Sequence, residues 1–337
     1  MTAAYITGGA GLIGSFIARQ LIEDRVVDSV VLLDHFGRYV DSLKETFVDY
    51  RRLRFVGIED KIVVERGDGS SHSVVYQTLK KHRPRYVIHL AALPLAKLPN
   101  LNPEEAQQGS IETTVKLIDS INQLKQDGGP APERFVYASS SMVYGDFQTE
   151  VATEEHPTNP KEIYGTMKLA GEVVTRGLCQ FYDIPFSIVR PSAVYGPTDM
   201  NRRVTQIFVE KAIFGEKITV HGQNEALDFT FVKDAAKGFV LAATKLAAVG
   251  ETFNITLGRA HTLLDFVKGL QKHFPNLRYE VTERDAFRPK RGTLSIDKAR
   301  RLLGYEPQYP LQRGIDEYVA FVRKHHPLAN MPERAVG

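Results

Sequence analysis

The chain has 337 residues, 43% of them hydrophobic and 25% charged, which are ordinary values for a globular protein with one large domain or a main domain and a smaller one. Its net charge of +3, from 43 basic and 40 acidic residues, argues against a nucleic-acid-binding surface. The single cysteine, Cys179, excludes an intramolecular disulfide and a cysteine zinc cluster, and we expect it to be buried filler. No apolar run reaches the ~18 residues of a membrane span, and no basic segment of a secretory signal opens the chain. We therefore expect a soluble cytoplasmic protein without a metal site.

Short β-rich runs alternate with helical stretches through the first half of the chain. Strands are expected at residues 3–7, 29–34, 61–68, 86–92, 134–140 and 186–192, with helices such as 12–24 and 109–125 between them. This alternation predicts βαβ units and a parallel sheet. The runs 30–33 and 86–92 are apolar on both faces, as parallel strands covered by helices should be.

The second half of the chain loses this rhythm. From about Tyr195 onward, short strands and long loops predict a smaller lobe that is partly interleaved with the first domain. Near the C-terminus, a helix that begins at Leu311 has an apolar face with a spacing of three to four residues, formed by Leu311, Ile315, Val319 and Val322. We expect this helix to dock on the lobe, and we expect His325, His326 and the chain beyond them to be solvated.

A glycine-rich turn, ITGGAGLIG, follows the first strand and opens the first helix. Its glycines permit a tight turn, close approach of the backbone to a pyrophosphate, and close packing of helix and strand. The diphosphate would rest on the helix N-terminus, where free N–H groups and the helix dipole favour negative charge. The pattern predicts a dinucleotide-binding turn formed by Gly8, Gly11, Leu12, Ile13 and Gly14.

Asp34 ends the second strand, 20 residues after Gly14. A carboxylate at this place accepts hydrogen bonds from the ribose hydroxyls of the adenosine and repels a 2′-phosphate. Arg38 lies close enough in the sequence to complicate the choice between NAD and NADP, but Asp34 favours NAD. We thus predict a Rossmann-type doubly wound parallel sheet that binds NAD, with residues 1–190 as the NAD-binding domain. Residues 191–337 would form mainly the substrate lobe, with some segments returning to the first domain.

Tyr164 and Lys168 lie four positions apart on an expected helix, and so share one face of it. Alone, such a pair is most often a solvated surface pair. Here it lies within an ordered set of motifs: TGGAGLIG (7–14), RGD (66–68), HLAA (89–92), SSSMVYG (139–145), YGTMK (164–168), RPSAVYGP (190–197), LDFTFVKDAA (227–236) and FRPKRGTLSIDKARRLLGYEP (287–307). Over residues 3–325 this set resembles the extended short-chain dehydrogenase/reductase family, in particular its nucleotide-sugar epimerases and dehydratases.

The resemblance implies a catalytic role for Ser140, Tyr164 and Lys168. Lys168 would reach the ribose of the cofactor, while Tyr164 and the Ser140 hydroxyl would meet the sugar oxygen that loses or gains a proton. A phenol with a pKa near ~10 is a poor base at neutral pH, and lowering its pKa to ~7 requires about 4 kcal/mol. A nearby ammonium and the positive nicotinamide are expected to supply this together.

The resemblance assigns further residues to the cofactor. Asp68 and Gly69 follow the third strand and are similar to the family's adenine-contacting pair, and Ala91 in HLAA would lie beneath the cofactor. His89, in the same strand, is expected to be a core histidine with satisfied hydrogen bonds.

Met142 stands two residues after Ser140, where the 4,6-dehydratases of the family carry an acidic residue. A thioether is neither an acid nor a base, so dehydration is disfavoured. The sequence therefore favours an NAD-dependent nucleotide-sugar epimerase. In enzymes of this kind the epimerised carbon is most often C4 of the sugar, and the reaction passes through a transient keto-sugar intermediate. An NAD-dependent dehydrogenase or reductase of a sugar or polyol is the main alternative. A dehydratase or decarboxylase, and a dinucleotide-sensing binding protein, are less favoured.

Three positions depart from the family pattern, which often has Asn at Ala193, Arg at Leu227 and Asn at Ser110. Arg288 keeps the family's late phosphate-binding arginine. Ser141, Arg203 and Arg288 are the expected substrate-binding residues, and the basic residues Arg202, Lys290 and Arg291 are expected to compensate for the departures. The resemblance also implies a homodimer, and the helices at 109–125 and 166–182 are apolar enough to pair across a two-fold axis.

Overall fold

The computed structural model describes residues 2–37, 48–93, 102–285 and 288–327. Its centre is a seven-stranded sheet in the order β10-β7-β5-β4-β1-β2-β3, and all neighbouring strands are parallel. The strands are β1 (Ala3–Thr7), β2 (Ser29–Asp34), β3 (Ile62–Arg66), β4 (Tyr86–His89), β5 (Arg134–Ala138), β7 (Phe186–Pro191) and β10 (Thr252–Ile255). The chain returns from β3 to β4 on the other side of β1, so the sheet is doubly wound and of the Rossmann type.

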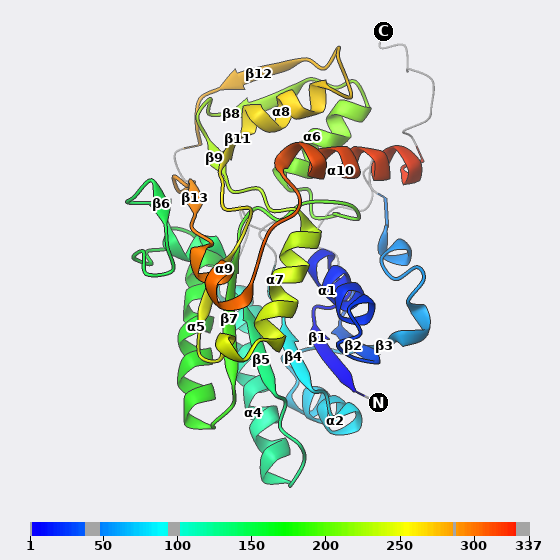
Figure 1. Ribbon diagram of the computed structural model, residues 1–337, viewed down its shortest axis with the longest axis vertical. Coiled ribbons are helices and arrows are strands. Elements are labelled where there is room, and N and C mark those ends of the chain that lie inside the picture. Colours follow the sequence, from blue (N-terminus) through cyan, green and yellow to red (C-terminus); the bar gives the residue numbers. More distant parts are fainter. Residues whose placement is uncertain (1, 38–47, 94–101, 286–287, 328–337) are drawn as a thin grey trace.

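Helices cover both faces of this sheet (Figure 1). The helices of the sheet domain are α1 (Leu12–Glu23), α2 (His72–His82), α3 (Pro103–Gln107), α4 (Thr113–Gln126), α5 (Ile163–Phe181), α7 (Val232–Thr244) and α9 (Asp297–Leu303). The strands alternate their side chains between two cores: Ala4 and Ile6 pack towards α1 and α7, whereas Tyr5 packs with residues of α2 and α4. Burial on both faces explains why β1, β4 and β5 read as continuous apolar runs.

Apart from α7, β10 and α9, the elements after β7 build a second lobe, which forms the upper part of the molecule in Figure 1. It contains α6 (Val204–Ile213), β8 (Ile218–His221), β9 (Ala226–Leu227), β11 (His261–Thr262), α8 (Leu263–Gln271), β12 (Tyr279–Thr282) and α10 (Leu311–His325). Its own hydrophobic core includes Tyr195, Phe229, Phe266 and Ile315. The apolar face expected on α10 is confirmed, because Leu311, Ile315, Val319 and Val322 are all buried in this core.

Short elements complete the fold. They are the 3₁₀ turns η1 (Arg51–Leu53), η2 (Glu59–Lys61), η5 (Ser141–Tyr144) and η6 (Leu246–Ala248), the π turn η4 (Gln108–Glu112), and the paired strands β6 (Val151–Ala152) and β13 (Thr293–Leu294). The expected helix at 109–125 therefore begins with a π turn before α4. The strands expected at 86–92 and 134–140 end earlier, at His89 and Ala138. After β4 the chain leaves the sheet, and Leu90, Ala91 and Ala92 line a cavity.

The segment 251–258 returns from the second half of the chain to the sheet. Its strand β10 pairs with β7 and becomes one edge of the sheet, and α7 packs against α1 on the same face as α9. The expected solvation of His326 is wrong: this residue is buried, and its ring packs edge-on against Phe214 at 5.1 Å. The chain beyond it, at 328–337, lies outside the described residues.

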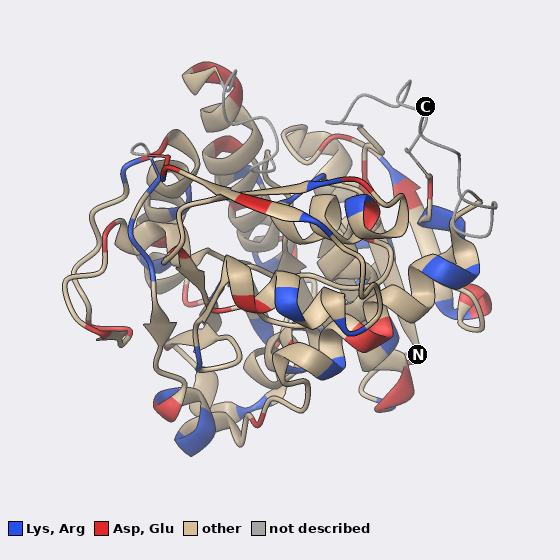
Figure 2. Cartoon of the chain, turned by 90° about the horizontal axis from the view of Figure 1, so that it is seen from above, with Lys and Arg blue, Asp and Glu red and all other residues tan. Residues whose placement is uncertain are grey.

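Basic and acidic residues are interspersed over both lobes in the view of Figure 2. Among the described residues, no helix combines the length and apolar character that crossing a membrane requires. Within the same residues, no group of three or more histidine, cysteine, aspartate or glutamate side chains could hold a metal ion. Cys179 is buried, as expected, and burial raises the pKa of its thiol to about 12.

Candidate active site

A cavity of about 280 Å³ lies at the carboxyl ends of β1, β2 and β4. The strand order reverses between β1 and β4, which is where doubly wound sheets bind their ligands. The cofactor residues expected before α5 all line this cavity: Gly8, Gly11, Leu12, Ile13, Gly14, Asp34, Asp68, Gly69 and Ala91. Residues separated by more than 80 positions in the sequence thus meet at one site.

The glycine turn is shaped by two close approaches of the backbone. Gly8 has a φ of +66°, and a Cβ on it would lie 3.0 Å from the backbone nitrogen of Ala91. A Cβ on Gly14 would lie 2.7 Å from the Cα of Gly9, so the first turn of α1 can pass close to the strand. The helix begins at Leu12 after Gly11, which provides no side-chain cap. Its first N–H groups therefore remain available for an anion in the cavity.

Asp34 is oriented by the backbone on both sides of it. The N–H of Ala10 donates to its Oδ2 at 3.1 Å, and the N–H of Phe36 donates to its Oδ1 at 2.7 Å. Further along the cavity wall, the N–H of Ser70 donates to Asp68 Oδ1 at 2.9 Å. The carboxylate of Asp34 is thus held beside the glycine turn, as ribose recognition requires. Arg38 lies outside the described residues.

Ser140, Tyr164 and Lys168 come together at the carboxyl end of β5. Tyr164 and Lys168 share one face of α5, and the Lys168 Nζ lies 5.9 Å from the centre of the Tyr164 ring. The Ser140 side chain caps η5 by accepting a hydrogen bond from the Met142 N–H at 3.2 Å, and it is hydrogen-bonded to Tyr164. Lys168 is only 3% exposed, and its Nζ donates to the carbonyl oxygen of Ala138 at 2.7 Å.

Burial sets the protonation of this group. It raises the pKa of Tyr164, while the charge of Arg203 and the hydrogen bond with Ser140 act in the opposite direction. It also lowers the pKa of Lys168 to about 7, against the opposing charge of Glu172. The protein groups alone therefore do not produce the low tyrosine pKa that the sequence led us to expect. The positive charge of an oxidised nicotinamide is still needed for it.

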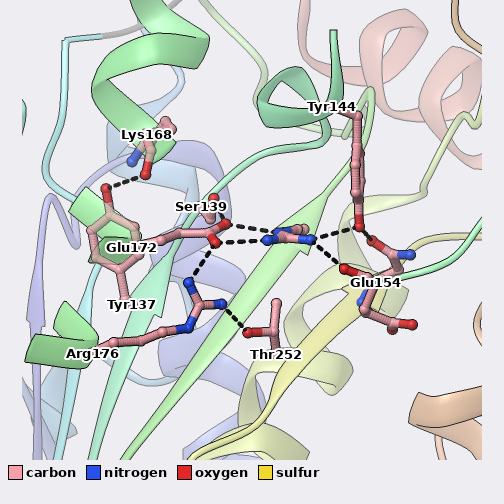
Figure 3. Close-up of polar contacts among 10 residues, drawn as sticks. Tyr137, Ser139, Tyr144, Glu154, Lys168, Glu172, Arg176 and Thr252 are labelled. Atoms are coloured by element: carbon pink, nitrogen blue, oxygen red, sulfur yellow. Dashed lines mark hydrogen bonds and ion pairs between the residues drawn. The ribbon is translucent and has the colours of Figure 1, made fainter. Parts of the chain in front are cut away.

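A buried ionic network lies between α5 and β7, close to Lys168 (Figure 3). Glu172, one turn after Lys168 on α5, accepts hydrogen bonds from Arg190 Nε at 2.8 Å and from Arg190 Nη2 at 2.7 Å. Ser139 Oγ donates to the same carboxylate at 2.5 Å. Arg190 Nη1 also donates to Tyr144 Oη at 3.0 Å. The network joins α5, β5, β7 and η5, which are the elements that position Ser140, Tyr164 and Lys168.

A model of the NAD dependent epimerase/dehydratase family matches residues 4–256. The chain belongs to this family. It is 26% identical over 326 residues to an uncharacterised UDP-glucose epimerase of Bacillus subtilis, covering 94% of this chain and 96% of that protein. A dTDP-glucose 4,6-dehydratase of Haemophilus influenzae is also 26% identical, over 335 residues that cover 93% of this chain and 96% of that protein.

Solved structures of the same fold include the UDP-glucuronic acid 4-epimerase from Bacillus cereus in complex with UDP-glucuronic acid and NAD. That structure has a TM-score of 0.84 and 23% identity, and the alignment covers 96% of this chain and 99% of that one. NAD is the cofactor of this epimerase/dehydratase family. The cavity fits it, since it combines an uncapped helix N-terminus, glycines where a Cβ would intrude, and a fixed carboxylate at the end of β2.

The substrate-binding residues expected in this epimerase/dehydratase chain have different surroundings. Arg203 lines the cofactor cavity, and its charge acts on Tyr164. Ser141 is buried within η5, and Arg288 is exposed on a loop, where its Nε lies 3.3 Å from Asp285. Sequence motifs locate such residues in the chain but not the directions of their side chains.

The three departures from the family pattern have different surroundings. Leu227 is part of the apolar core of the second lobe, and Ser110 is buried in η4. Ala193 has a φ of +38°, in the left-handed region that asparagine and glycine occupy more readily than alanine. The backbone at Ala193 thus keeps a conformation suited to the residue that the family often has there.

His89 is a core histidine, as expected. Its Nδ1 is hydrogen-bonded to Thr7 Oγ1 at 2.6 Å and its Nε2 to Thr114 Oγ1 at 3.0 Å, and burial lowers its pKa to about 3. Sequence analysis missed Arg54 and Met200, which line the cavity, and Glu172. Only Glu172 had a signal in the sequence, because it follows Lys168 by one helical turn.

Proposed function

We propose that this protein is an NAD-dependent nucleotide-sugar epimerase that acts at C4 of the sugar through a transient keto-sugar intermediate. The proposal is carried by one arrangement: Ser140, Tyr164 and Lys168 stand together, and position 142 next to them holds a methionine. The group is linked to the cofactor cavity by Arg203, which lines the cavity and whose charge acts on Tyr164. The UDP-glucose epimerase of Bacillus subtilis, which matches over nearly its whole length, supports the same reaction class.

In this reaction Tyr164 takes the proton from the sugar hydroxyl and later returns it. The Ser140 hydroxyl, already hydrogen-bonded to Tyr164, bridges the phenol and the substrate oxygen. NAD, when bound, accepts the ring hydride and gives it back to the other face of the same carbon. The buried ammonium of Lys168 stabilises the phenolate, because opposite charges interact more strongly where water is excluded.

Met142 disfavours loss of water from the sugar. It is buried at 5% exposure between Ser140 and the loop before β13, and the Nη1 of Arg291 lies 3.5 Å from its Sδ. A guanidinium that stays protonated at neutral pH cannot act there as the acid or base of a dehydration. The sugar environment at this position is therefore basic and apolar.

A nucleotide diphosphate has three arginines available near the catalytic end of α5. Arg203 acts on Tyr164, and Arg288 and Arg291 both act on the carboxylate of Glu162, the residue before α5. The buried Oε2 of Glu162 and the buried Nε of Arg291 have no hydrogen-bond partner. Buried polar atoms of this kind are costly, and a hydroxyl-rich, anionic ligand would satisfy them. Ser141, the first residue of η5, follows Ser140 directly and completes the proposed substrate residues.

The deciding experiment is proton NMR of the purified protein with UDP-, GDP-, CDP- and dTDP-sugars and no added cofactor. We expect one sugar to develop a second anomeric signal that grows to a fixed ratio, with Tyr164→Phe inactive as the control. In a parallel sample with added NAD, stoichiometric reduction of that NAD together with an oxidised sugar product would instead establish the net dehydrogenase. A 4-keto-6-deoxy product would establish a dehydratase and contradict the argument from Met142.

We also propose a homodimer in the cytoplasm, formed by α4 and α5. These helices pack side by side on one face of the sheet. The outer surface of α5 exposes two apolar side chains, Val173 at 63% and Phe181 at 82%. Large exposed apolar groups on one helix are typical of an interface.

A further inference from the structure

Arg54 is a buried arginine that links the two lobes above the cofactor cavity. It is 6% exposed and lines the cavity. Its Nη1 makes a short hydrogen bond to the carbonyl oxygen of Ala10, inside the glycine turn. Its Nη2 donates to the carbonyl oxygen of Thr198 at 2.7 Å, and its Nε donates to Thr198 Oγ1 at 3.3 Å. One guanidinium thus joins segments 188 positions apart.

Thr198 belongs to a segment that we name the strap, residues 196–203. The strap connects β7 of the sheet to α6 of the second lobe, and its residues Met200, Asn201 and Arg203 line the cofactor cavity opposite the glycine turn. A second attachment lies near Arg54, because the N–H of Tyr50 donates to the Met200 Sδ at 3.1 Å. Tyr50 is itself buried and packs edge-on against Phe321 of α10.

The backbone of the strap is strained in its docked position. Thr198 has a φ of +67° and Arg202 a φ of +49°. A β-branched residue in the left-handed region is a true outlier, and such conformations cost about 1–3 kcal/mol each unless the surroundings impose them. The contacts from Arg54 and Tyr50 are the surroundings that do so here. The docked conformation of the strap is therefore stabilised by its contacts with Arg54 and Tyr50 and not by the backbone preferences of its own residues.

We propose that Arg54 is the positioning residue that locks the strap over the cofactor cavity, so that NAD is released only when the strap detaches. The strap can detach only when the hydrogen bonds between the Arg54 guanidinium and Thr198 break, whether or not the bond to Ala10 remains. Once they break, the backbone strain of the strap favours opening. The same lock reaches the catalytic end through Arg203, which follows Arg202 at the end of the strap and acts on Tyr164.

The inference goes beyond the proposed reaction, because it concerns the rate of cofactor release without any sugar. A slow release suits an enzyme that reuses the same NAD in each turnover, but the lock can be tested whatever the substrate is.

The test measures dissociation of labelled NAD from the saturated protein after a chase with excess unlabelled NAD. Arg54→Met removes all three hydrogen bonds and keeps most of the side-chain volume, and we expect NAD to dissociate roughly tenfold faster or more. Arg54→Lys keeps the charge but cannot bond both segments in the same way, and it should give an intermediate rate. Arg52→Met, at the exposed neighbouring position in η1, is the matched control.

A second readout separates detachment of the strap from general unfolding. Limited trypsin digestion followed by mass spectrometry should show faster cleavage after Arg202 and Arg203 in Arg54→Met than in Arg52→Met, with the rest of the chain cut at the usual rate. Equal NAD dissociation rates in the two variants would overturn the proposal. So would faster release that accompanies uniform digestion and a large loss of thermal stability in both Arg54 variants, since the arginine would then support the whole fold and not the strap.

Discussion

At the residue scale, the fold buries the ammonium of Lys168, one of the three residues that we propose as catalytic, at a cost in stability. Lys168 is 3% exposed, and its hydrogen bond to the Ala138 carbonyl does not replace full hydration, so burial lowers its pKa from 10.5 to about 7. A shift of this direction means that the unfolded chain binds the proton more tightly than the folded one. The buried charge of Lys168 therefore destabilises the protein near and below neutral pH.

Lys168→Met should stabilise the cofactor-free protein, and the gain should depend on pH. Below about pH 7 the lysine is charged in both states and the cost is complete, whereas the cost fades as the pH rises towards the unfolded pKa of 10.5. At 1.36 kcal/mol per pKa unit, the gain should shrink by about 2–3 kcal/mol between about pH 6 and about pH 9. Urea unfolding at both pH values measures this.

Lys268→Met, at an exposed position on α8, controls for the loss of a lysine as such. A gain that is the same at both pH values, or that the control reproduces, would contradict the account of Lys168.

Ala193 offers a second test at this scale, because its φ of +38° is unfavourable for any residue with a Cβ. Ala193→Gly should raise the free energy of unfolding by about 0.5–1 kcal/mol: relief of left-handed strain is worth about 1–2 kcal/mol, and the extra freedom of glycine in the unfolded chain offsets part of it. Ala170→Gly in the middle of α5 should instead lower it by about 1 kcal/mol. If both substitutions destabilise equally in urea unfolding, the backbone at Ala193 is not strained.

At the scale of elements, α5 is held to the sheet by the buried pair of Glu172 and Arg190 (Figure 3). Burial opposes ionisation of Glu172, but the hydrogen bonds and charges of Arg190 and Ser139 outweigh it and lower its pKa. The stabilisation from this carboxylate is present above its unfolded pKa of 4.5 and is lost as the pH falls through the lower folded value. The pair ties α5, the helix that carries Tyr164 and Lys168, to β7 of the sheet.

Glu172→Gln should destabilise the protein by about 3–5 kcal/mol, since it leaves the Arg190 charge buried without its partner. Arg190→Met should do the same for Glu172. The double variant should cost clearly less than the sum of the two, because it leaves no uncompensated charge. Urea unfolding of the four proteins gives the coupling energy, and strictly additive losses would show that the pair does not act as a unit.

At the scale of the whole molecule, two cores are joined across the cofactor cavity. The sheet domain and the second lobe each have their own apolar core, and segments that return to the sheet, such as β10, make the two inseparable in sequence. In Figure 1, α5 extends along the sheet domain and the second lobe lies above it. The exposed Val173 and Phe181 of α5 do not line the cavity. A second copy of the chain can therefore pair there without blocking the cavity.

Phe181→Asp should convert the proposed dimer into a monomer, because it places a charge where an 82% exposed aromatic ring would be covered. Light scattering after size exclusion measures the mass. Val64→Asp, on the exposed edge strand β3, is the control that should leave the mass unchanged. A monomeric wild-type protein would contradict the proposed dimer. A Phe181→Asp protein that stays dimeric would show that the interface lies elsewhere.

The strands of the central sheet and the glycine turn could be predicted from the sequence alone. Periodicity and turn residues predict the strands of the sheet, since local apolar runs and glycine turns follow backbone geometry that needs no distant partner. The glycine turn, Asp34 and the Tyr164 and Lys168 pair are local patterns, and they lie where such patterns predict.

Only the tertiary structure decided how distant side chains share one environment. Desolvation raises the pKa of Tyr164, and the fold covers His326 and brings Arg54 to Thr198. These outcomes depend on desolvation and on contacts between segments far apart in the chain. Neither can be predicted from a short stretch of sequence.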